Sequence, residues 1–331
     1  MDLSEKAGKI NEILKKYLPP IPEDKKYEAD NESKVASIEE VMEYSVMSGG
    51  KRLRGIMLLE AFRLYSLDKD IEKELAEPFA AAIECIHAYS LVHDDLPSMD
   101  NDMYRRGKLT THAKYGHAFG VLAGDALLNY AFEIMSQAAL GLTKVRGEMA
   151  GELFVRACRA MSAIVTRSGY SGMIGGQVMD VYPETASSGN TATAGTFTDL
   201  DEKARKIDRL YRIYELKTSR LFQAALCAGA ILAGAEKEQI ADMEEIGYCI
   251  GEAFQIKDDI LDKNASFEEL GKDIGSDEKN DKTTSVTLLG VTEAEEASEQ
   301  FLDRAVTLLG KQPGNKDFFR DLTQFLKVRR K

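Results

Sequence analysis

Apolar residues recur at helical spacing along most of this 331-residue chain. Side chains at i, i+3, i+4 and i+7 share one face of an α-helix, so this period indicates helices with a buried face. Proline, which interrupts helices, occurs only 7 times. No apolar–polar alternation typical of a half-buried strand lasts more than a few residues. We therefore predict an all-α fold, with its clearest helical stretches at residues 39–64, 76–95, 121–140, 209–233 and 240–262.

The length of the chain allows one large domain or two smaller ones. Glycine and asparagine separate the helical stretches and mark their ends. One segment differs from the rest: residues 183–198 are rich in Ser, Thr, Ala and Gly and contain little that could be buried. We predict that this segment is a surface loop.

Composition restricts the class of protein. With 44% hydrophobic and 30% charged residues, the chain resembles an ordinary globular protein. The net charge of −12 argues against nucleic acid as a partner. No uninterrupted apolar run reaches the roughly 18 residues of a membrane helix, so we predict no membrane span. Residues 1–16 also lack the apolar middle of a secretory signal.

The four cysteines, Cys85, Cys158, Cys227 and Cys249, lie far apart, and no two form a CxxC pair. Each lies in an apolar stretch of helical period. We predict that all four are buried free thiols rather than metal ligands or redox pairs, as is usual in the cytoplasm.

Two clusters of aspartate each end a strongly apolar helical stretch. The first runs from Asp94 to Asp102 and contains Pro97, which prevents a regular continuation of the helix. In the second, Asp258 and Asp262 are four residues apart and share one helix face. Like charges at that spacing repel unless a cation relieves them, and Mg²⁺ prefers carboxylate oxygens and substrate phosphates. Solvated helix ends are the alternative interpretation, which the presence of two such clusters makes less favourable.

Two basic clusters lie beside glycine. Residues 49–54 read Gly-Gly-Lys-Arg-Leu-Arg at a predicted helix start, and residues 105–107 read Arg-Arg-Gly directly after the first aspartate cluster. Backbone N–H groups at a helix start favour an anion, and arginine matches phosphate oxygens. The clusters together predict two phosphate sites, one with carboxylates and one with cations alone. An ordinary charged surface is the alternative for either cluster taken singly.

These motifs resemble those of the trans-isoprenyl diphosphate synthases, or polyprenyl synthetases, and most of all those of bacterial farnesyl diphosphate synthases. The resemblance covers about residues 37–289. Its motifs are specific and occur in this order: GGKRLR (49–54), the first aspartate cluster with RRG (94–107), GDALL (124–128), GGQxxD (175–180), LKTSRLF (216–222), FQIKDDILD (254–262) and GKDIGSDEKNDKTT (271–284).

The resemblance implies a single domain over residues 1–331 with the isoprenoid synthase fold, roughly ten or more helices around a deep central cavity, usually as a homodimer. It implies a prenyl transferase that joins isopentenyl diphosphate head to tail to dimethylallyl and geranyl diphosphate, giving (2E,6E)-farnesyl diphosphate. The cofactor that it implies is Mg²⁺, three ions per active site, with Mn²⁺ as a substitute.

The resemblance also implies roles for single residues. The implied metal ligands are Asp94, Asp95 and Asp100 on one wall and Asp258 on the other, supported by Asp259 and Asp262. The implied contacts to the allylic diphosphate are Arg105, Lys217, Lys272 and Lys282. The implied isopentenyl diphosphate site consists of Gly50, Lys51, Arg54, His87 and Arg106. The allylic cation would be stabilised by the Lys217 carbonyl, Thr218 and Gln255.

Two residues before the first aspartate cluster are predicted to face the cavity. His87 lies seven residues before Asp94, two turns along the same helix face, whereas His93 and His112 are predicted to be structural. Tyr89 lies five residues before Asp94, about 7 Å along the axis, where a large ring would stop chain growth near fifteen carbons. Plain core packing is the alternative role for Tyr89.

The chain departs from the family pattern at Gly55, which replaces a proline, and we expect this glycine to loosen the helix start. Three alternative functions stay open. Geranylgeranyl diphosphate synthases share the spacing of the first cluster, a class I terpene cyclase also ionises an allylic diphosphate, and a non-catalytic subunit could assist a partner synthase. The two basic clusters argue against the cyclase, and the complete aspartate clusters argue against the silent subunit.

Overall fold

The computed structural model describes residues 2–23, 36–142, 147–182, 199–264 and 283–329. The predicted loop at 183–198 and the two predicted phosphate contacts Lys272 and Lys282 lie outside the described residues.

The described residues are almost entirely helical, which confirms the predicted all-α bundle of ten or more helices. The first helices in chain order are α1 (Leu3–Tyr17), α2 (Ile38–Met47), α3 (Leu53–Tyr65), α4 (Lys69–Ile71), the π-helix η2 (Glu72–Ala76), α5 (Glu77–Asp94), α6 (Thr111–Tyr115), α7 (His117–Leu142), the 3₁₀ turn η3 (Gly147–Met149) and α8 (Ala150–Ser168). They are followed by α9 (Met173–Val181), α10 (Asp199–Tyr214), the π-helix η5 (Glu215–Ser219), α11 (Arg220–Ala233), α12 (Lys237–Asn264), α15 (Ser285–Leu289), α16 (Val291–Gly310) and α17 (Asp317–Val328). The strands β1 (Tyr104–Arg105) and β2 (Lys108–Leu109) form a small antiparallel hairpin.

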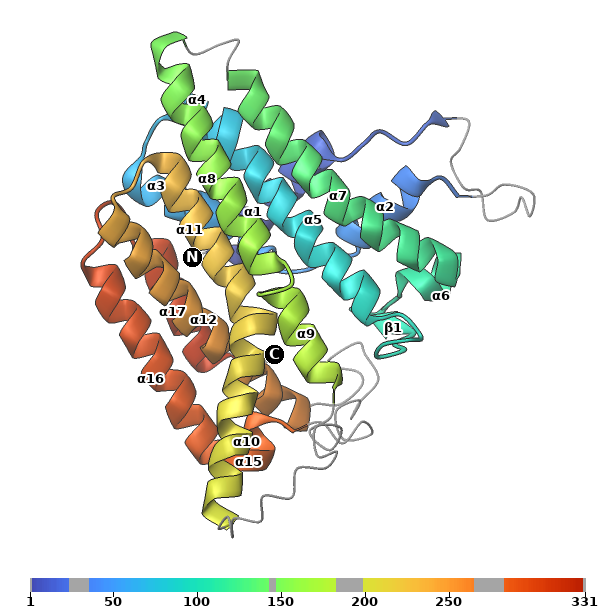
Figure 1. The fold of residues 1–331 in the computed structure, drawn as a ribbon, viewed down its shortest axis with the longest axis vertical. Helices are drawn as coiled ribbons and strands as arrows, with labels where there is room; N and C mark the ends of the chain where they lie inside the picture. Colours follow the sequence, from blue (N-terminus) through green and yellow to red (C-terminus); the bar gives the residue numbers. More distant parts are fainter. Residues whose placement is uncertain (1, 24–35, 143–146, 183–198, 265–282, 330–331) are drawn as a thin grey trace.

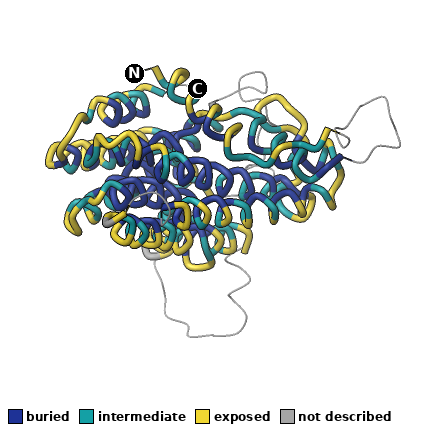
Figure 2. The backbone as a smooth tube through the Cα atoms, turned by 90° about the horizontal axis from the view of Figure 1, so that it is seen from above, coloured by how far each residue is buried: buried dark blue, intermediate teal, exposed yellow. Residues whose placement is uncertain are grey.

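Helices α3, α5 and α11 form the centre of the bundle, and most of their residues are buried. Every residue from Leu221 to Leu232 of α11 is buried. α11 packs on α3, α8 and α12, and α5 packs on α3 and α7. A Cβ on Gly229 would lie 2.2 Å from the carbonyl oxygen of Leu58, so this glycine lets α11 and α3 approach closely. Figure 2 shows these buried segments inside a layer of partly exposed helices.

One long helical run crosses the molecule from α10 through η5 into α11 (Figure 1). The π-helical turn η5 interrupts its regular hydrogen bonding at residues 215–219, inside the predicted LKTSRLF motif. Such turns are frequent at functional sites because they change the direction in which side chains point. The sequence predicted the helix here but not this turn.

Helix α7 is long and apolar enough to cross a membrane, by length and composition alone. Its inner residues, among them Leu127 and Ala131, belong to the main core and pack against α5 and α8. Core helices of globular proteins pass the same test, so α7 does not argue against the predicted absence of a span.

The prediction of four buried cysteines is wrong for Cys158, which is exposed, and is confirmed for the other three. Cys158 lies on α8, whose inner face carries Ala157 and Ala160. The apolar surroundings in sequence belong to that inner face, and Cys158 points away from it.

Candidate active site

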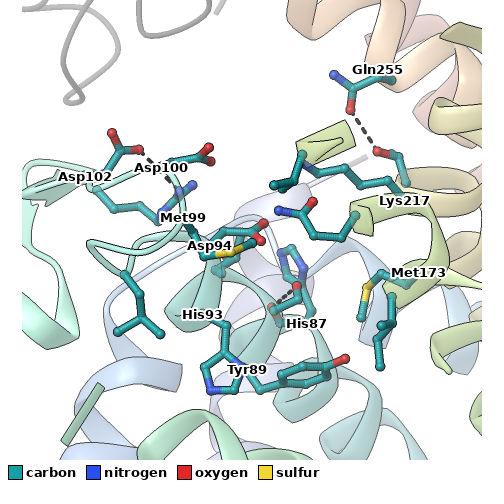
Figure 3. A pocket seen from close by; sticks show the side chains of 18 of the residues that line it. His87, Tyr89, His93, Asp94, Met99, Asp100, Asp102, Met173, Lys217 and Gln255 are labelled. Atoms are coloured by element: carbon teal, nitrogen blue, oxygen red, sulfur yellow. Dashed lines mark hydrogen bonds and ion pairs between the residues drawn. The ribbon is translucent and has the colours of Figure 1, made fainter. Parts of the chain in front are cut away.

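A cavity of about 940 Å³ opens between α5, α9, η5 and α12. Figure 3 shows Asp94, Asp100 and Asp102 on one side of it, Lys217 and Gln255 on the other, and Tyr89 beneath them. The predicted central cavity is therefore present, and it brings together motifs as far apart in the sequence as Arg54 and Asp262.

The first aspartate cluster turns back on itself after α5. Pro97 follows the helix end, and the amide of Asp100 donates a hydrogen bond of 2.9 Å to the carbonyl of Asp94. Asn101 has a positive φ of 55°, a conformation that asparagine tolerates better than most residues. This turn places Asp94, Asp100 and Asp102 on the cavity wall. Burial and the neighbouring Asp100 raise the pKa of Asp94, while Lys217 opposes that rise.

Asp95 does not line the cavity. Its carboxylate accepts a hydrogen bond of 2.7 Å from Nε of Arg105, and only 4% of the residue is exposed. Burial raises the pKa of Asp95 to about 6, and the charge of Arg105 opposes that rise. The geometry favours Asp95 as the residue that holds Arg105 at the cavity edge. It also adds Asp102, which the sequence had not singled out, to the carboxylates Asp94 and Asp100 in the cavity.

The second cluster divides in a similar way along α12. Asp258 and Asp262 line the cavity, as their shared helix face predicts. Asp259 points to the other side, where its carboxylate accepts hydrogen bonds from the hydroxyl of Tyr214, the amide and hydroxyl of Ser285, and the amide of Gln255. The geometry therefore does not support Asp259 as a metal ligand. It supports a role in fastening α12 to α10 and α15.

The π-helical turn η5 presents two polar residues to the cavity. Lys217 forms an ion pair of 2.6 Å with Asp180 of the GGQxxD motif on α9. The hydroxyl of Thr218 donates a hydrogen bond of 2.8 Å to the amide oxygen of Gln255 (Figure 3). The side-chain amide of Gln255 in turn donates a hydrogen bond of 3.1 Å to the carboxylate of Asp259. This bond fixes the orientation of Gln255.

A buried glutamate holds η5 against α12. Glu252 is fully buried, and its carboxyl accepts a hydrogen bond of 2.8 Å from the hydroxyl of Ser219, the last residue of η5. A Cβ on Gly251 would lie 2.5 Å from Cα of Ser219, so this glycine permits the contact. Burial, with a smaller contribution from Glu215, raises the pKa of Glu252 to about 8. Tyr211 and Tyr248 are the other titratable neighbours.

Basic residues gather in another part of the cavity. Arg54, Arg106 and His87 line it, as predicted. Burial lowers the pKa of Arg54 to about 10, and burial together with the surrounding arginines lowers the pKa of His87 well below its usual value. His87 is therefore neutral at pH 7, and it lies 3.3 Å from a guanidinium nitrogen of Arg54.

The two remaining predicted residues of this site, Gly50 and Lys51, lie beside the cavity rather than in its lining. A Cβ on Gly50 would lie 2.6 Å from the guanidinium of Arg106 and would displace this side chain, and the φ of +127° at Gly50 also favours glycine. Burial and the nearby Arg329 lower the pKa of Lys51. All the predicted cations that the structure describes are thus close together.

Arg329 is a cavity residue that the sequence did not reveal. It follows α17, lies over the ring of Phe254 at 4.8 Å, and forms an ion pair of 2.7 Å with Asp258. No motif marks this arginine, and only the packing of α17 on the bundle brings it to the cavity.

The floor of the cavity is apolar. Tyr89, Leu128, Met173 and Val178 contribute to it. The hydroxyl of Tyr89 is buried and has no hydrogen-bond partner among the described residues. His93, predicted to be structural, lies against the ring of Tyr89 and also lines the cavity.

The cavity carboxylates suit a metal ion that is also coordinated by a bound substrate. Within the described ranges, no three His, Cys, Asp or Glu side chains converge into a ready metal site. Mg²⁺ usually takes one or two carboxylates and completes its shell with water and phosphate oxygens. Asp94 and Asp100 on one wall, and Asp258 and Asp262 on the other, suit that mode of binding.

Comparisons with known proteins agree with this geometry. Residues 35–322 match the family model described as polyprenyl synthetase. A farnesyl diphosphate synthase of Micrococcus luteus is 40% identical over 82% of this chain and 80% of that protein. A chloroplastic geranylgeranyl pyrophosphate synthase of Catharanthus roseus is 38% identical over 80% of this chain and 65% of its own length. The structure of a Helicobacter pylori geranyltransferase complexed with magnesium and isoprenyl diphosphate matches with a TM-score of 0.70 and 27% identity, covering 98% of this chain and 94% of that one.

The raised pKa of Glu252 predicts a pH-dependent stability. The folded state keeps the proton up to a pKa of about 8, against 4.5 for an ordinary glutamate. The contribution of protonated Glu252 to the free energy of unfolding is therefore complete below pH 4.5 and is lost as the pH rises through 8. Glu252→Gln, which cannot ionise, should gain about 4 kcal/mol of unfolding free energy over the wild type between pH 5 and 9, at about 1.4 kcal/mol per pKa unit. Urea unfolding at both pH values measures this, with Glu238→Gln, an exposed glutamate of the same helix, as the control. Equal pH profiles for Glu252→Gln and the wild type would contradict it.

Proposed function

The chain belongs to the polyprenyl synthetase family, and we propose on this basis that it condenses isopentenyl diphosphate with dimethylallyl and then geranyl diphosphate, head to tail, to give (2E,6E)-farnesyl diphosphate. The enzyme is a prenyl transferase with geranyltransferase activity. Its relatives include a farnesyl and a geranylgeranyl synthase at similar identity, so the chemistry is better supported than the length of the product.

The observation that carries this proposal is the pairing of two different anion sites over one apolar floor. One site combines the carboxylates Asp94, Asp100 and Asp258 with the cation Lys217. The other offers Arg54 and Arg106, with Lys51 beside them, and is richer in cations, although the charge of Asp258 also acts on Lys51 and Arg54. Two diphosphates, one metal-bound and one held by cations, fit this division.

Magnesium bound between the carboxylates would neutralise the allylic diphosphate and make it a better leaving group. Asp94, Asp100, Asp258 and Asp262 are the residues proposed to hold it. Three ions per site, and Mn²⁺ as a substitute, remain parts of the proposal. The magnesium named with the Helicobacter pylori structure supports the choice of metal.

The remaining steps follow from the side chains. Arg105 and Lys217 stabilise the departing diphosphate while the allylic C–O bond breaks. The Lys217 carbonyl, the Thr218 hydroxyl and the Gln255 amide supply neutral dipoles for the allylic cation, and none of them is a strong nucleophile. The double bond of isopentenyl diphosphate attacks the cation, a C–C bond forms, and the released diphosphate accepts the proton. Lys272 and Lys282 remain proposed contacts to the same diphosphate.

A homodimer in the cytoplasm completes the proposal. Several exposed large apolar side chains lie on the neighbouring helices α7 and α8, among them Leu122, Leu140, Val155 and Val165. Apolar residues exposed on neighbouring helices are typical of a surface that another protein covers. A second copy of the chain is the partner that fits the resemblance.

Product analysis tests the reaction. Purified protein with Mg²⁺, isopentenyl diphosphate and dimethylallyl diphosphate should form a fifteen-carbon product, and a chelator should abolish it. A twenty-carbon product would support prenyl transfer and contradict the farnesyl assignment. Folded protein that forms no product would favour the non-catalytic subunit.

The floor argument predicts a longer product from Tyr89→Ala. Removing the ring opens the apolar floor next to Leu128, so chain growth should continue to twenty carbons or more. Chromatography of the dephosphorylated products measures the length. Tyr130→Ala, a tyrosine of α7 whose hydroxyl donates to the carbonyl of Tyr17 away from the cavity, is the matched control. An unchanged fifteen-carbon product from Tyr89→Ala would rule the floor role out.

The dimer proposal predicts a change of mass in solution. Light scattering coupled to size exclusion should give twice the chain mass for the wild type, and the double variant Leu122→Glu/Val155→Glu should shift toward the monomer because charge is costly in an apolar interface. A monomeric wild type at micromolar concentration would count against this surface.

A further inference from the structure

Gly55 donates a hydrogen bond that the family's usual proline could not donate. Its backbone N–H lies 2.8 Å from Oε1 of Glu84, a residue of α5 that is only 2% exposed. We expected Gly55 to loosen the start of α3. That expectation is wrong, because the glycine amide is fastened to the neighbouring helix.

The start of α3 explains why this bond matters. The first N–H groups of a helix have no partner within it. Arg52 is the N-cap residue, has a φ of +52°, and makes no side-chain cap hydrogen bond. The amide of Ile56 is the first to bond back, to the carbonyl of Arg52 at 3.0 Å. Gly55 therefore carries an otherwise unpaired donor, which a proline would remove and which Glu84 satisfies here.

The contact also needs a small residue. A Cβ on Gly55 would lie 3.1 Å from Cγ of Glu84 and 3.3 Å from both the carbonyl oxygen of Ala80 and a methyl group of Ile10. These distances are tight, so a larger side chain would push Glu84 away. Gly55 and Glu84 thus form a matched pair across α3 and α5.

The second oxygen of Glu84 faces Arg52. The carboxylate and guanidinium are 3.6 Å apart, and both side chains are almost fully buried. Arg52 also donates a hydrogen bond of 2.9 Å to the side-chain oxygen of Asn11 on α1 and one of 2.6 Å to the carbonyl of Val46 on α2. This one arginine joins three helices to the loop that carries the first basic motif.

The residues on either side of Arg52 belong to the proposed isopentenyl diphosphate site. Lys51 precedes it, and Arg54 follows two positions later. The charge of Glu84 opposes the lowering of the Arg54 pKa by burial, and it acts on the pKa of Arg106 in the same direction. A buried carboxylate behind three cations reduces their mutual repulsion without occupying the cavity.

We propose that Glu84 is a positioning residue for the cation-only diphosphate site, acting through the Gly55 amide and the Arg52 guanidinium. It sets the direction of Lys51 and Arg54 and does not touch the substrate. The identity of the anion, isopentenyl diphosphate, rests on the proposed function. The positioning itself rests on the contacts of Glu84.

Steady-state kinetics with both substrates test this role. Glu84→Gln keeps an acceptor for the Gly55 amide and removes the charge beside Arg52. We expect the KM for isopentenyl diphosphate to rise about tenfold, the loss typical of one buried charged contact, while the KM for the allylic diphosphate and kcat change less than about threefold. Gly55→Pro removes the donor and adds side-chain atoms that push Glu84 away, and should also raise the same KM. Glu77→Gln, a change on the same helix far from the cavity, is the matched control.

A metal-free titration separates this role from the proposed function. Isothermal titration of inorganic pyrophosphate in the presence of a chelator reports the cation-only site without turnover. A wild type that makes no prenyl product, with weaker pyrophosphate binding by folded Glu84→Gln, would refute the function and support the positioning role. An active wild type whose Glu84→Gln variant keeps both its KM values and its pyrophosphate affinity would refute the positioning role alone. Equal rises in both KM values would also refute it, as a general loss of structure. Should Glu84→Gln not fold, Gly55→Pro decides in the same measurements.

Discussion

The structure depends on a balance of charge inside one partly buried cavity. Arginine, lysine and aspartate side chains enter it from helices that are distant in sequence, and each would be costly to bury alone. Arg329 is paired with Asp258, and Lys217 with Asp180. These pairs join α17 to α12 and η5 to α9, so the charges that await a substrate also hold the walls together. When a diphosphate enters, these cations would exchange one negatively charged partner for another. No cation would then be buried without a partner.

The backbone makes this arrangement possible at a few points of close approach. The π-helical turn η5 directs Lys217 and Thr218 into the cavity, and Gly251 lets α12 come near enough for Glu252 to hold that turn. At the other end, Gly55 and Glu84 fix the start of α3. The two ends of the cavity are thus supported in the same manner, by a glycine, a buried glutamate and a hydroxyl or amide donor.

The sequence was sufficient for the fold and for most of the site, since helical period and charge clusters are local signals. The sequence was a weaker guide to the direction in which each side chain points. Asp258 and Asp259 are adjacent, yet consecutive residues on a helix point about 100° apart, so only one of them faces the cavity. The same helix geometry explains the exposed Cys158. Arg329 and the acceptor of Gly55 depend on contacts between distant segments, which no local pattern can reveal.

The contact between His93 and Gly124 shows how packing between distant segments restricts the substitutions that evolution can accept. A Cβ on Gly124 would lie 2.0 Å from Nε2 of His93, so the ring occupies a notch that only glycine provides. Tyr89, one turn away, contacts His93 edge to face, with the ring centroids 5.8 Å apart, and its hydroxyl has no partner among the described residues. A descendant of this chain could therefore remodel the floor through single substitutions at Tyr89. Enlarging α7 at Gly124 would require a simultaneous change at His93, which makes that route much rarer.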